Sequence, residues 1–423
     1  MSDTPGTSGT SGTSGTVAPG HELAEIITDL GAIEHNVATL VRVAAPAGVM
    51  AVVKADGYNH GMVDVARAAL AGGAAALGVA TLGEAIALRG QGVDAPLTAW
   101  MWMADPALED LRPAVELDIT LGIPSLEHLR AAVEVSRTAL ADGAYAPLRV
   151  GLMVDTGLSR SGISPHDWST AVTEAARAAA DGLLEVRGAY SHLTSADDLS
   201  NPVTDLQAER FDAAIADCRA AGLEMPVNHI ANTPATLTRP DLRHELVRPG
   251  VSVYGVYAVD PAAIPAPVRE QFGGDIQLRE SMTVRARVVT TRVVPAGEGV
   301  SYGHLWRAER DTRTAVVALG YADGIPRNLS GRFGVTINGE FFPQIGRVCM
   351  DQFVVDLGPV DTDTGADAEN PGAQVRPGDW AVIFGEGGCS VEEIADAGDT
   401  IAYEILTLPR GRVARRTVGG ATV

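Results

Sequence analysis

One residue of this chain differs chemically from every other, because Lys54 is the only lysine among its 423 residues. The chain holds 32 lysine and arginine residues, so arginine supplies the basic charge everywhere else. An arginine guanidinium stays protonated and cannot form a Schiff base, whereas a desolvated lysine amine can. A genome biased toward arginine explains the arginines, but not why the one lysine directly follows the strand-like run 49–53. Lys54 is therefore predicted to form a Schiff base.

Further reactive or cationic side chains follow the apolar runs farther along the chain. They are Tyr58 after the first run, Arg160 beyond the fifth, His192 at the end of the sixth, His229, Asn232 and Thr233 at the seventh, and Arg248 and Gly250 after the eighth. A lone histidine is more often a packed residue than a functional one. A lysine, two arginines, two histidines and a hydroxyl at one place form a cationic site that suits a phosphate and a carboxylate.

The elements that would position these residues alternate between short apolar runs and longer alanine-rich stretches. The runs begin near Val49, Ala76, Pro96, Ile119, Leu148, Glu185, Pro226 and Leu246, and the helical stretches include Val63–Ala71, Glu127–Leu140, Trp168–Ala180 and Asp205–Ala221. Eight such alternations predict an α/β fold, a TIM-type (β/α)₈ barrel, whose chemistry lies at the carboxyl ends of the strands. An open doubly wound sheet is the alternative, but it more usually stops at five or six strands.

The rest of the chain divides by composition. A Gly-Thr-Ser repeat predicts a disordered tail over residues 1–20, before a barrel domain over 21–258. A stretch rich in proline and glycine predicts a linker over 259–278. Short β-rich runs then predict a mainly β domain over 279–423; they are Ser281–Val294, Thr314–Leu319, Val335–Ile337, Phe353–Leu357 and Trp380–Phe384.

Charge and cysteine content exclude several classes of function. A formal net charge of −21 argues against nucleic-acid binding, which needs clustered basic residues. No apolar run approaches the roughly 18 residues that a membrane helix needs. Three widely separated cysteines favour a reducing cytoplasm. The histidines are spread over different parts of the chain, so no metal site is predicted. The lack of a Gly-x-Ser-x-Gly motif argues against a serine hydrolase.

Eight motifs, in order from about residue 22 to the end, resemble those of alanine racemases. The first is Ala-Val-Val-Lys-Ala-Asp-Gly-Tyr-Asn-His-Gly at 51–61, which resembles the family's lysine motif for pyridoxal 5'-phosphate (PLP). The others are Asp-Thr-Gly at 155–157, His-Ile-Ala-Asn-Thr at 229–233, Val-Arg-Pro-Gly at 247–250, Gly-Val-Ser-Tyr-Gly at 299–303, Gly-Tyr-Ala-Asp-Gly at 320–324, Gly-Arg-Val-Cys-Met-Asp-Gln at 346–352 and Ala-Tyr-Glu at 402–404. The resemblance implies a cytoplasmic homodimer that interconverts L- and D-alanine and so supplies D-alanine for cell-wall peptidoglycan.

The resemblance also implies roles for individual residues. Lys54 would hold PLP and serve as one base, and Tyr302 of the partner subunit would be the other. The cofactor-binding set would add Tyr58, His192, Asn232, Thr233, Arg248, Gly250, Val251 and Tyr403, and the substrate-binding set would be Arg160, Tyr321, Met350 and Asp351. Two bases are needed because the proton leaves one face of the α-carbon and returns to the other. A tyrosine with a pKa of about 10 needs cationic neighbours to act as a base near neutrality, a role expected of Arg248 and His192.

The sequence departs from the family pattern mainly at Met153. Many members carry a lysine there, often modified to a carbamate that orients the arginine seven residues later. Arg160 must then be held by a bound anion or by another side chain. Thr233 replaces a serine and keeps its hydroxyl.

Other functions stay open at this point. One is racemisation of a slightly larger amino acid such as serine. Another is a barrel-type PLP decarboxylase, which would carry a catalytic cysteine in its second domain; Cys349 matches that cysteine only weakly. A non-catalytic PLP carrier would be a lone barrel, which the second domain argues against.

Overall fold

The computed structural model describes residues 22–360 and 370–420, so the predicted tail at 1–20 lies outside the described residues. Contacts between Cα atoms divide the chain into two compact units. The barrel unit spans residues 29–281 with the last residues from 418 on, and the β unit spans residues up to 28 and 282–417. Within the described ranges, no helix is long and apolar enough to cross a membrane.

The barrel unit is built on seven parallel strands, in the order β7-β6-β5-β4-β3-β2-β8. They are β2 (Gly48–Val52), β3 (Ala76–Thr81), β4 (Leu97–Met101), β5 (Ile119–Ile123), β6 (Leu148–Met153), β7 (Leu184–Tyr190) and β8 (Leu246–Val247). Their side chains are mostly buried, as continuous apolar runs require in a parallel sheet that is covered on both faces. The predicted (β/α)₈ class is confirmed, with one irregular position.

That irregular position is the seventh predicted run, near Pro226. Proline lacks the N–H that a strand ladder needs, and the run forms only a parallel bridge between Tyr190 and His229. On its other side, the Arg248 N–H donates to the Ala231 carbonyl at 2.8 Å, next to β8. The segment therefore fills the gap between β7 and β8 without forming a regular strand.

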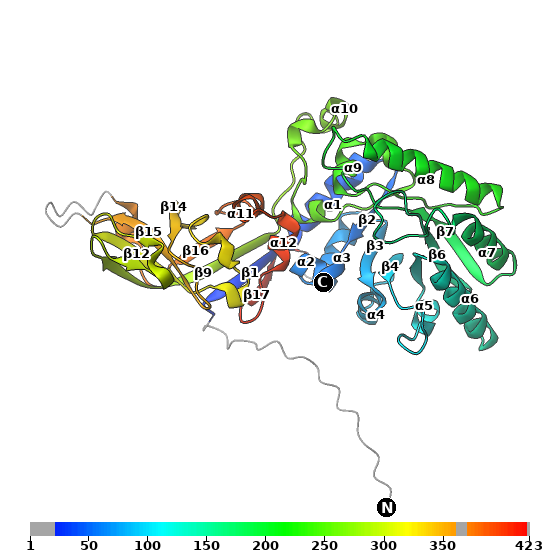
Figure 1. The fold of residues 1–423 in the computed structure, drawn as a ribbon, viewed down its shortest axis with the longest axis horizontal. Coiled ribbons are helices and arrows are strands. Elements are labelled where there is room, and N and C mark those ends of the chain that lie inside the picture. The colour runs from blue at the N-terminus through cyan, green and yellow to red at the C-terminus, as the bar shows by residue number, and fades with distance from the viewer. Residues whose placement is uncertain (1–21, 361–369, 421–423) are drawn as a thin grey trace, which may run out of the picture. The chain divides into compact units, whose positions relative to one another are not determined.

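The helices follow the strands in alternation, and Figure 1 shows α4 to α8 around the outside of the sheet. The helices of the barrel unit are α1 (Leu30–Ala44), α2 (Lys54–Asn59), α3 (Met62–Ala71), α4 (Leu82–Gly90), α5 (Arg112–Glu116), α6 (Leu126–Ala141), α7 (Trp168–Ala180), α8 (Val203–Ala220), α9 (Thr233–Thr238) and α10 (Ala266–Glu270). Side-chain caps mark several starts, such as the Thr81–Glu84 capping box of α4. The four predicted helical stretches correspond to α3, α6, α7 and α8.

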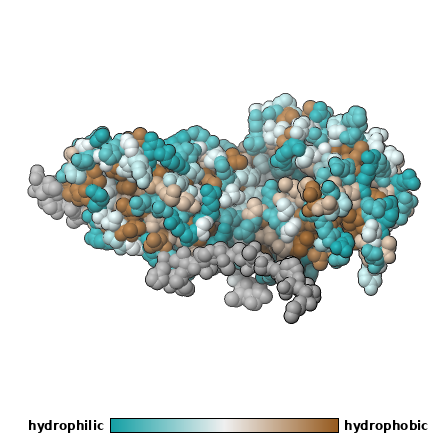
Figure 2. All heavy atoms as spheres, turned by 60° about the horizontal axis from the view of Figure 1, so that its bottom comes forward, coloured by the Kyte–Doolittle hydropathy of each residue, from teal (hydrophilic) through white to brown (hydrophobic). Residues whose placement is uncertain are grey.

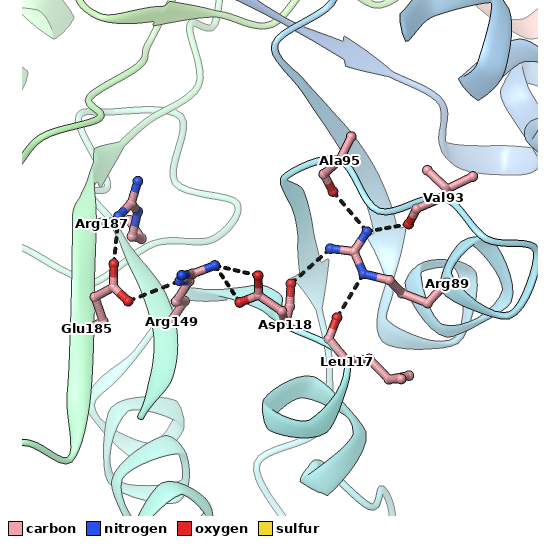
Figure 3. Close-up of polar contacts among 8 residues, drawn as sticks. All are labelled: Arg89, Val93, Ala95, Leu117, Asp118, Arg149, Glu185 and Arg187. Carbon is pink, nitrogen blue, oxygen red and sulfur yellow. Dashed lines mark hydrogen bonds and ion pairs between the residues drawn. The ribbon is translucent and has the colours of Figure 1, made fainter. Parts of the chain in front are cut away.

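A ladder of charged side chains joins the amino ends of the strands β5, β6 and β7 (Figure 3). Asp118 pairs with Arg149, Arg149 with Glu185 (3.0 Å) and Glu185 with Arg187 (2.6 Å). Arg89 extends the ladder by donating to four backbone carbonyls, those of Val93, Ala95, Leu117 and Asp118. This end of a barrel is usually the stabilising one, and chemistry takes place at the other.

The β unit holds an eight-stranded sheet in the order β12-β15-β14-β13-β16-β9-β1-β17, and an added β12–β9 pairing closes part of it. Its strands are β1 (Ala24–Asp29), β9 (Met282–Val294), β12 (Thr312–Val317), β13 (Gly334–Ile337), β14 (Glu340–Ile345), β15 (Phe353–Pro359), β16 (Trp380–Phe384) and β17 (Ala414–Val418). A hairpin of β10 (Gly299–Val300) and β11 (Trp306–Arg307) and the helices α11 (Val391–Ala397) and α12 (Ala402–Thr407) complete it. The predicted mainly β character of this region is confirmed.

Candidate active site

Lys54 begins a left-handed turn directly after β2. Ala55, Asp56, Gly57 and Tyr58 have φ of 51–61° and ψ of 42–51°, and Asn59 continues the run with φ of 69°. Left-handed geometry costs roughly 1–2 kcal/mol for each residue that carries a Cβ. Such strain persists only where the surroundings fix it, and it gathers at functional sites.

Two carboxylates help to hold this turn. Glu84 Oε1 accepts from the Ala55 N–H at 2.7 Å, and Asp56 Oδ1 accepts from the Met62 N–H at 2.9 Å. The second oxygen of Glu84 accepts from the backbone of Ala80 and Thr81. Glu84 thus binds main-chain N–H groups and forms no ion pair with Lys54 among the described residues.

The environment of Lys54 favours a neutral amine. Burial and the positive charge of Arg160 lower the pKa of Lys54; Glu84 opposes this shift, and Arg248 adds to it. A larger neutral fraction makes the amine a better nucleophile and a better base near neutral pH. The prediction of a reactive, desolvated amine therefore gains a physical basis.

Arg248 is 6% exposed and forms no ion pair within the described ranges. Its guanidinium donates instead to the backbone carbonyls of His229 and Ser191 and to Nδ1 of His229, at 2.7 Å. Burial lowers the pKa of Arg248 to about 10, so it remains protonated at neutral pH. Burial also holds the pKa of His229 well below its usual value, so that its ring is a neutral acceptor.

The expectation that His192 supplies positive charge is wrong. Burial, with the charges of Arg248, Arg160 and Lys54, lowers the pKa of His192 to about 3. The imidazole is therefore neutral at physiological pH and can only accept or donate hydrogen bonds. The same interactions show that these four side chains gather at the carboxyl ends of the strands.

Tyr58, Thr233 and Gly250 form a small cradle beside this group. The Gly250 N–H donates to Thr233 Oγ1 at 3.0 Å, and a Cβ on Gly250 would lie 2.5 Å from the Tyr58 hydroxyl. Only glycine leaves room there. Val251 is fully buried, and Asn232 caps α9 through its side-chain oxygen, which accepts from the Ala235 N–H at 3.3 Å.

Arg160 is exposed, and no hydrogen bond or ion pair of its guanidinium is found in the described part of the chain. Its loop is shaped by Asp155, whose carboxylate accepts from the N–H groups of Gly157 and Ser159 at 3.0 Å each. Met153 is buried at the end of β6 and offers no charge. Among the described residues, neither an acidic side chain nor Met153 therefore orients Arg160.

The other predicted residues lie in the β unit. Tyr302 is 71% exposed, and Tyr403 lies on α12. The Tyr321 loop is joined to the Met350 loop by the Tyr321 N–H donating to the Cys349 carbonyl at 3.0 Å. Asp351 pairs with Arg412.

Gln207 and Arg412 also position residues of the site, and no sequence pattern predicts this. Gln207, fully buried on α8, donates to Thr156 Oγ1 (2.9 Å) and to the His192 carbonyl (3.0 Å), which ties two loops of the site together. Arg412 bridges Asp351 to the buried Asp323, with Nε 2.8 Å from Asp323 Oδ1. Both lie far in sequence from the groups they hold, and no local pattern indicates such pairs.

Comparisons with known proteins agree with this geometry. Family models described as the N-terminal and C-terminal domains of alanine racemase match residues 28–258 and 281–417. The alanine racemase of Mycolicibacterium vanbaalenii is 47% identical over 93% of this chain and 94% of its own length, and that of Mycobacterium tuberculosis H37Rv is 44% identical over 93% and 95%. The crystal structure of alanine racemase from D-cycloserine-producing Streptomyces lavendulae has a TM-score of 0.83 at 40% identity and covers 94% of this chain and 98% of that one. The chain belongs to the alanine racemase family.

Proposed function

We propose that this protein is an alanine racemase, which uses PLP and two bases, Lys54 and Tyr302, to interconvert L- and D-alanine. The observation that carries the proposal is the environment of Lys54, a sole lysine whose amine is partly desolvated among cations. The sequences of relatives named alanine racemase support alanine as the substrate.

The residues at the barrel mouth fit PLP. Arg248 and Arg160 supply positive charge for anionic groups, and the hydroxyls of Thr233 and Tyr58 lie close to the backbone of Gly250. When bound, PLP would withdraw electrons from the α-carbon and so acidify its hydrogen. Arg248 would lie at the ring nitrogen, where a guanidinium that keeps its proton limits that withdrawal.

Different side chains of the protein would transfer protons and bind the substrate. The Lys54 amine would hold the cofactor's aldehyde and exchange a proton with one face of the α-carbon, on the side of the D-isomer. The phenol oxygen of Tyr302 would serve the opposite face. Arg160 and the Met350 backbone would bind the substrate carboxylate, while Tyr321 and Asp351 would line the entrance.

A homodimer would complete each site with Tyr302 of the partner subunit. Exposed apolar side chains on the β unit support this arrangement, with 71% of Tyr302, 62% of Leu305 and 52% of Met350 accessible. On the face in Figure 2, hydrophobic residues lie in groups among hydrophilic ones. The three cysteines form no disulfide, which supports a cytoplasmic location, and D-alanine made there would supply peptidoglycan.

The test uses the purified full chain. We expect a PLP absorbance band, and borohydride should fix a pyridoxyl group on a side chain at Lys54 only. Racemisation of alanine should exceed that of serine, and Lys54→Arg should abolish it although the charge is kept. A colourless protein that cannot be loaded with PLP would refute the proposal, and faster turnover of serine would change the substrate.

A further inference from the structure

The left-handed turn after Lys54 has a third support, the side chain of His60. His60 is 3% exposed, and its Nδ1 lies 3.0 Å from the Gly57 carbonyl oxygen and 2.9 Å from that of Tyr58. Both oxygens can only accept, so Nδ1 must carry the proton and donate to both. The imidazole therefore acts as a clamp on the main chain of the turn.

The clamp is itself fixed at its other edge. Nε2 of His60 lies 3.0 Å from Ser281 Oγ, which is also 3.1 Å from the Tyr254 carbonyl oxygen. The His60 ring stacks on Tyr254, with centroids 4.5 Å apart and an interplanar angle of 29°. With Nδ1 protonated, Nε2 can only accept, so the Ser281 hydroxyl donates its one proton to Nε2. This hydrogen bond, the Nδ1 donor and the stacked face hold the ring in a single orientation.

The same stack reaches the cofactor cradle. Tyr254 packs against Tyr58, with ring centroids 4.7 Å apart, and its hydroxyl donates to the Val52 carbonyl at 3.0 Å, at the end of β2. Tyr58 in turn lies against Gly250. His60 thus contacts, directly or through Tyr254, both ends of the segment that carries Lys54 and Tyr58.

We propose that His60 is a positioning residue whose N–H clamp keeps residues 55–59 left-handed and thereby presents Lys54 and Tyr58 to the cofactor. Without that donor, the carbonyls of Gly57 and Tyr58 lose their shared partner, and the turn relaxes toward the right-handed region that residues with a Cβ prefer. What the turn presents rests on the proposed function, whereas its dependence on His60 does not.

Two variants separate the clamp from the stack. His60→Phe keeps a ring on Tyr254 and removes the donor, whereas His60→Asn keeps a short N–H donor and removes the ring. His35→Phe is the matched control, because Nε2 of His35 also meets a backbone carbonyl, that of Gln277 at 2.9 Å, away from the turn. On each full-length protein we would measure amide hydrogen exchange across 53–62, the dissociation constant for PLP, and kcat and KM for alanine.

We expect His60→Phe to speed exchange across 53–62 and to weaken PLP binding by about tenfold, as the loss of a buried hydrogen bond implies. Its kcat should fall more than its KM changes. His60→Asn should recover part of both losses, and His35→Phe should match the unaltered protein. A Phe variant better than the Asn variant would overturn the clamp, since packing alone would then be at work.

Two further outcomes keep the test decisive. If His60→Phe does not fold, Ser281→Ala releases the far edge of the ring, and unchanged exchange across 53–62 in that variant would overturn the proposal. If the unaltered protein binds no PLP and racemises nothing, the proposed function fails, while the exchange comparison still decides whether His60 holds the turn.

Discussion

At the scale of single residues, the barrel mouth gathers positive charge without matching acids. Arg248 keeps its charge and donates hydrogen bonds to carbonyls and an imidazole, and Lys54 lies near Arg160 with Glu84 occupied by backbone N–H groups. A desolvated cationic group of this kind favours anions and a neutral lysine amine. Its chemistry follows from location as much as from residue type.

The two bases should separate by the handedness of the substrate. Tyr302→Phe should lower racemisation by roughly 10²–10⁴-fold, the usual worth of a positioned proton-transfer group. Lys54 should still exchange the α-hydrogen of D-alanine with solvent. Proton NMR in D₂O, followed by chiral chromatography, distinguishes exchange from inversion.

Tyr145→Phe is a suitable control, because Tyr145 is fully exposed on the barrel unit. If the Tyr302 variant racemised both isomers at a near-normal rate, Tyr302 would not be the second base. Tyr321 would then be examined first.

The neutral state of His192 links the site to acid stability. Its pKa is about 3 in the folded chain and about 6.5 when unfolded, so the unfolded chain binds the extra proton. Stability is complete above pH 6.5 and falls as the pH drops toward 3. Between pH 7.5 and pH 5, this protonation should lower the free energy of unfolding by about 2 kcal/mol. His192→Gln should abolish that part of the pH dependence.

Urea unfolding at the two pH values measures this difference. His166→Gln, at a histidine whose side chain is 94% exposed, is the control for a histidine substitution outside the site. An equal loss of stability in the His192 variant and the unaltered protein would show that His192 is charged in the folded state.

At the scale of elements, the barrel separates reactive and stabilising ends. Lys54, Arg160 and His192 follow the carboxyl ends of strands, while the ladder from Arg89 to Arg187 joins the amino ends (Figure 3). Changes to the ladder should therefore alter stability and leave turnover intact.

Arg149→Met tests this separation and keeps much of the side-chain stem. The pair is partly exposed, so solvent screening limits the expected loss of unfolding free energy to about 0.5–1 kcal/mol. Burial raises the pKa of Glu185, but hydrogen bonds from Arg187 and Arg149 outweigh it and lower that pKa. The contribution is thus present above about pH 4.3 and is lost as the pH falls through the folded value.

Urea unfolding at pH 7 and pH 3 measures the difference, and kcat should not change. Arg137→Met, which removes an exposed pair with Glu134 within α6, is the matched control. A drop in kcat without a drop in stability would place the ladder in the reaction.

At the scale of the whole molecule, the proposed site needs two subunits. Mixing inactive Lys54→Ala with inactive Tyr302→Phe should restore about a quarter of the activity, because half of the dimers are mixed and one of their two sites is intact. Subunit exchange is followed by native mass spectrometry, and activity by D-alanine formation. Mixing Lys54→Ala with Lys54→Arg should restore nothing.

Failure to complement despite proven exchange would place both bases in one chain. The barrel would then work with its own β unit, and the exposed Tyr302 would require another explanation.

Local patterns in the sequence were sufficient for the barrel class and for the reactive lysine. Apolar runs and helical stretches repeat at short range, so the alternation, and α6 and α7 nearly to the residue, could be predicted. Lys54 could be predicted as the reactive residue because it is the only lysine in the chain. The order of motifs along the chain was enough to indicate the family.

Tertiary structure alone decided three features. The turn at 55–59 is left-handed against local preference, because distant groups such as Glu84 and Ser281 hold it directly or through His60. His192 is neutral because burial and three surrounding cations set its pKa. The strand β1 pairs with β9 across more than 250 residues, a contact that no local periodicity contains. Short-range sequence patterns record the elements, whereas strain, protonation and long-range pairing depend on neighbours that only the folded chain brings together.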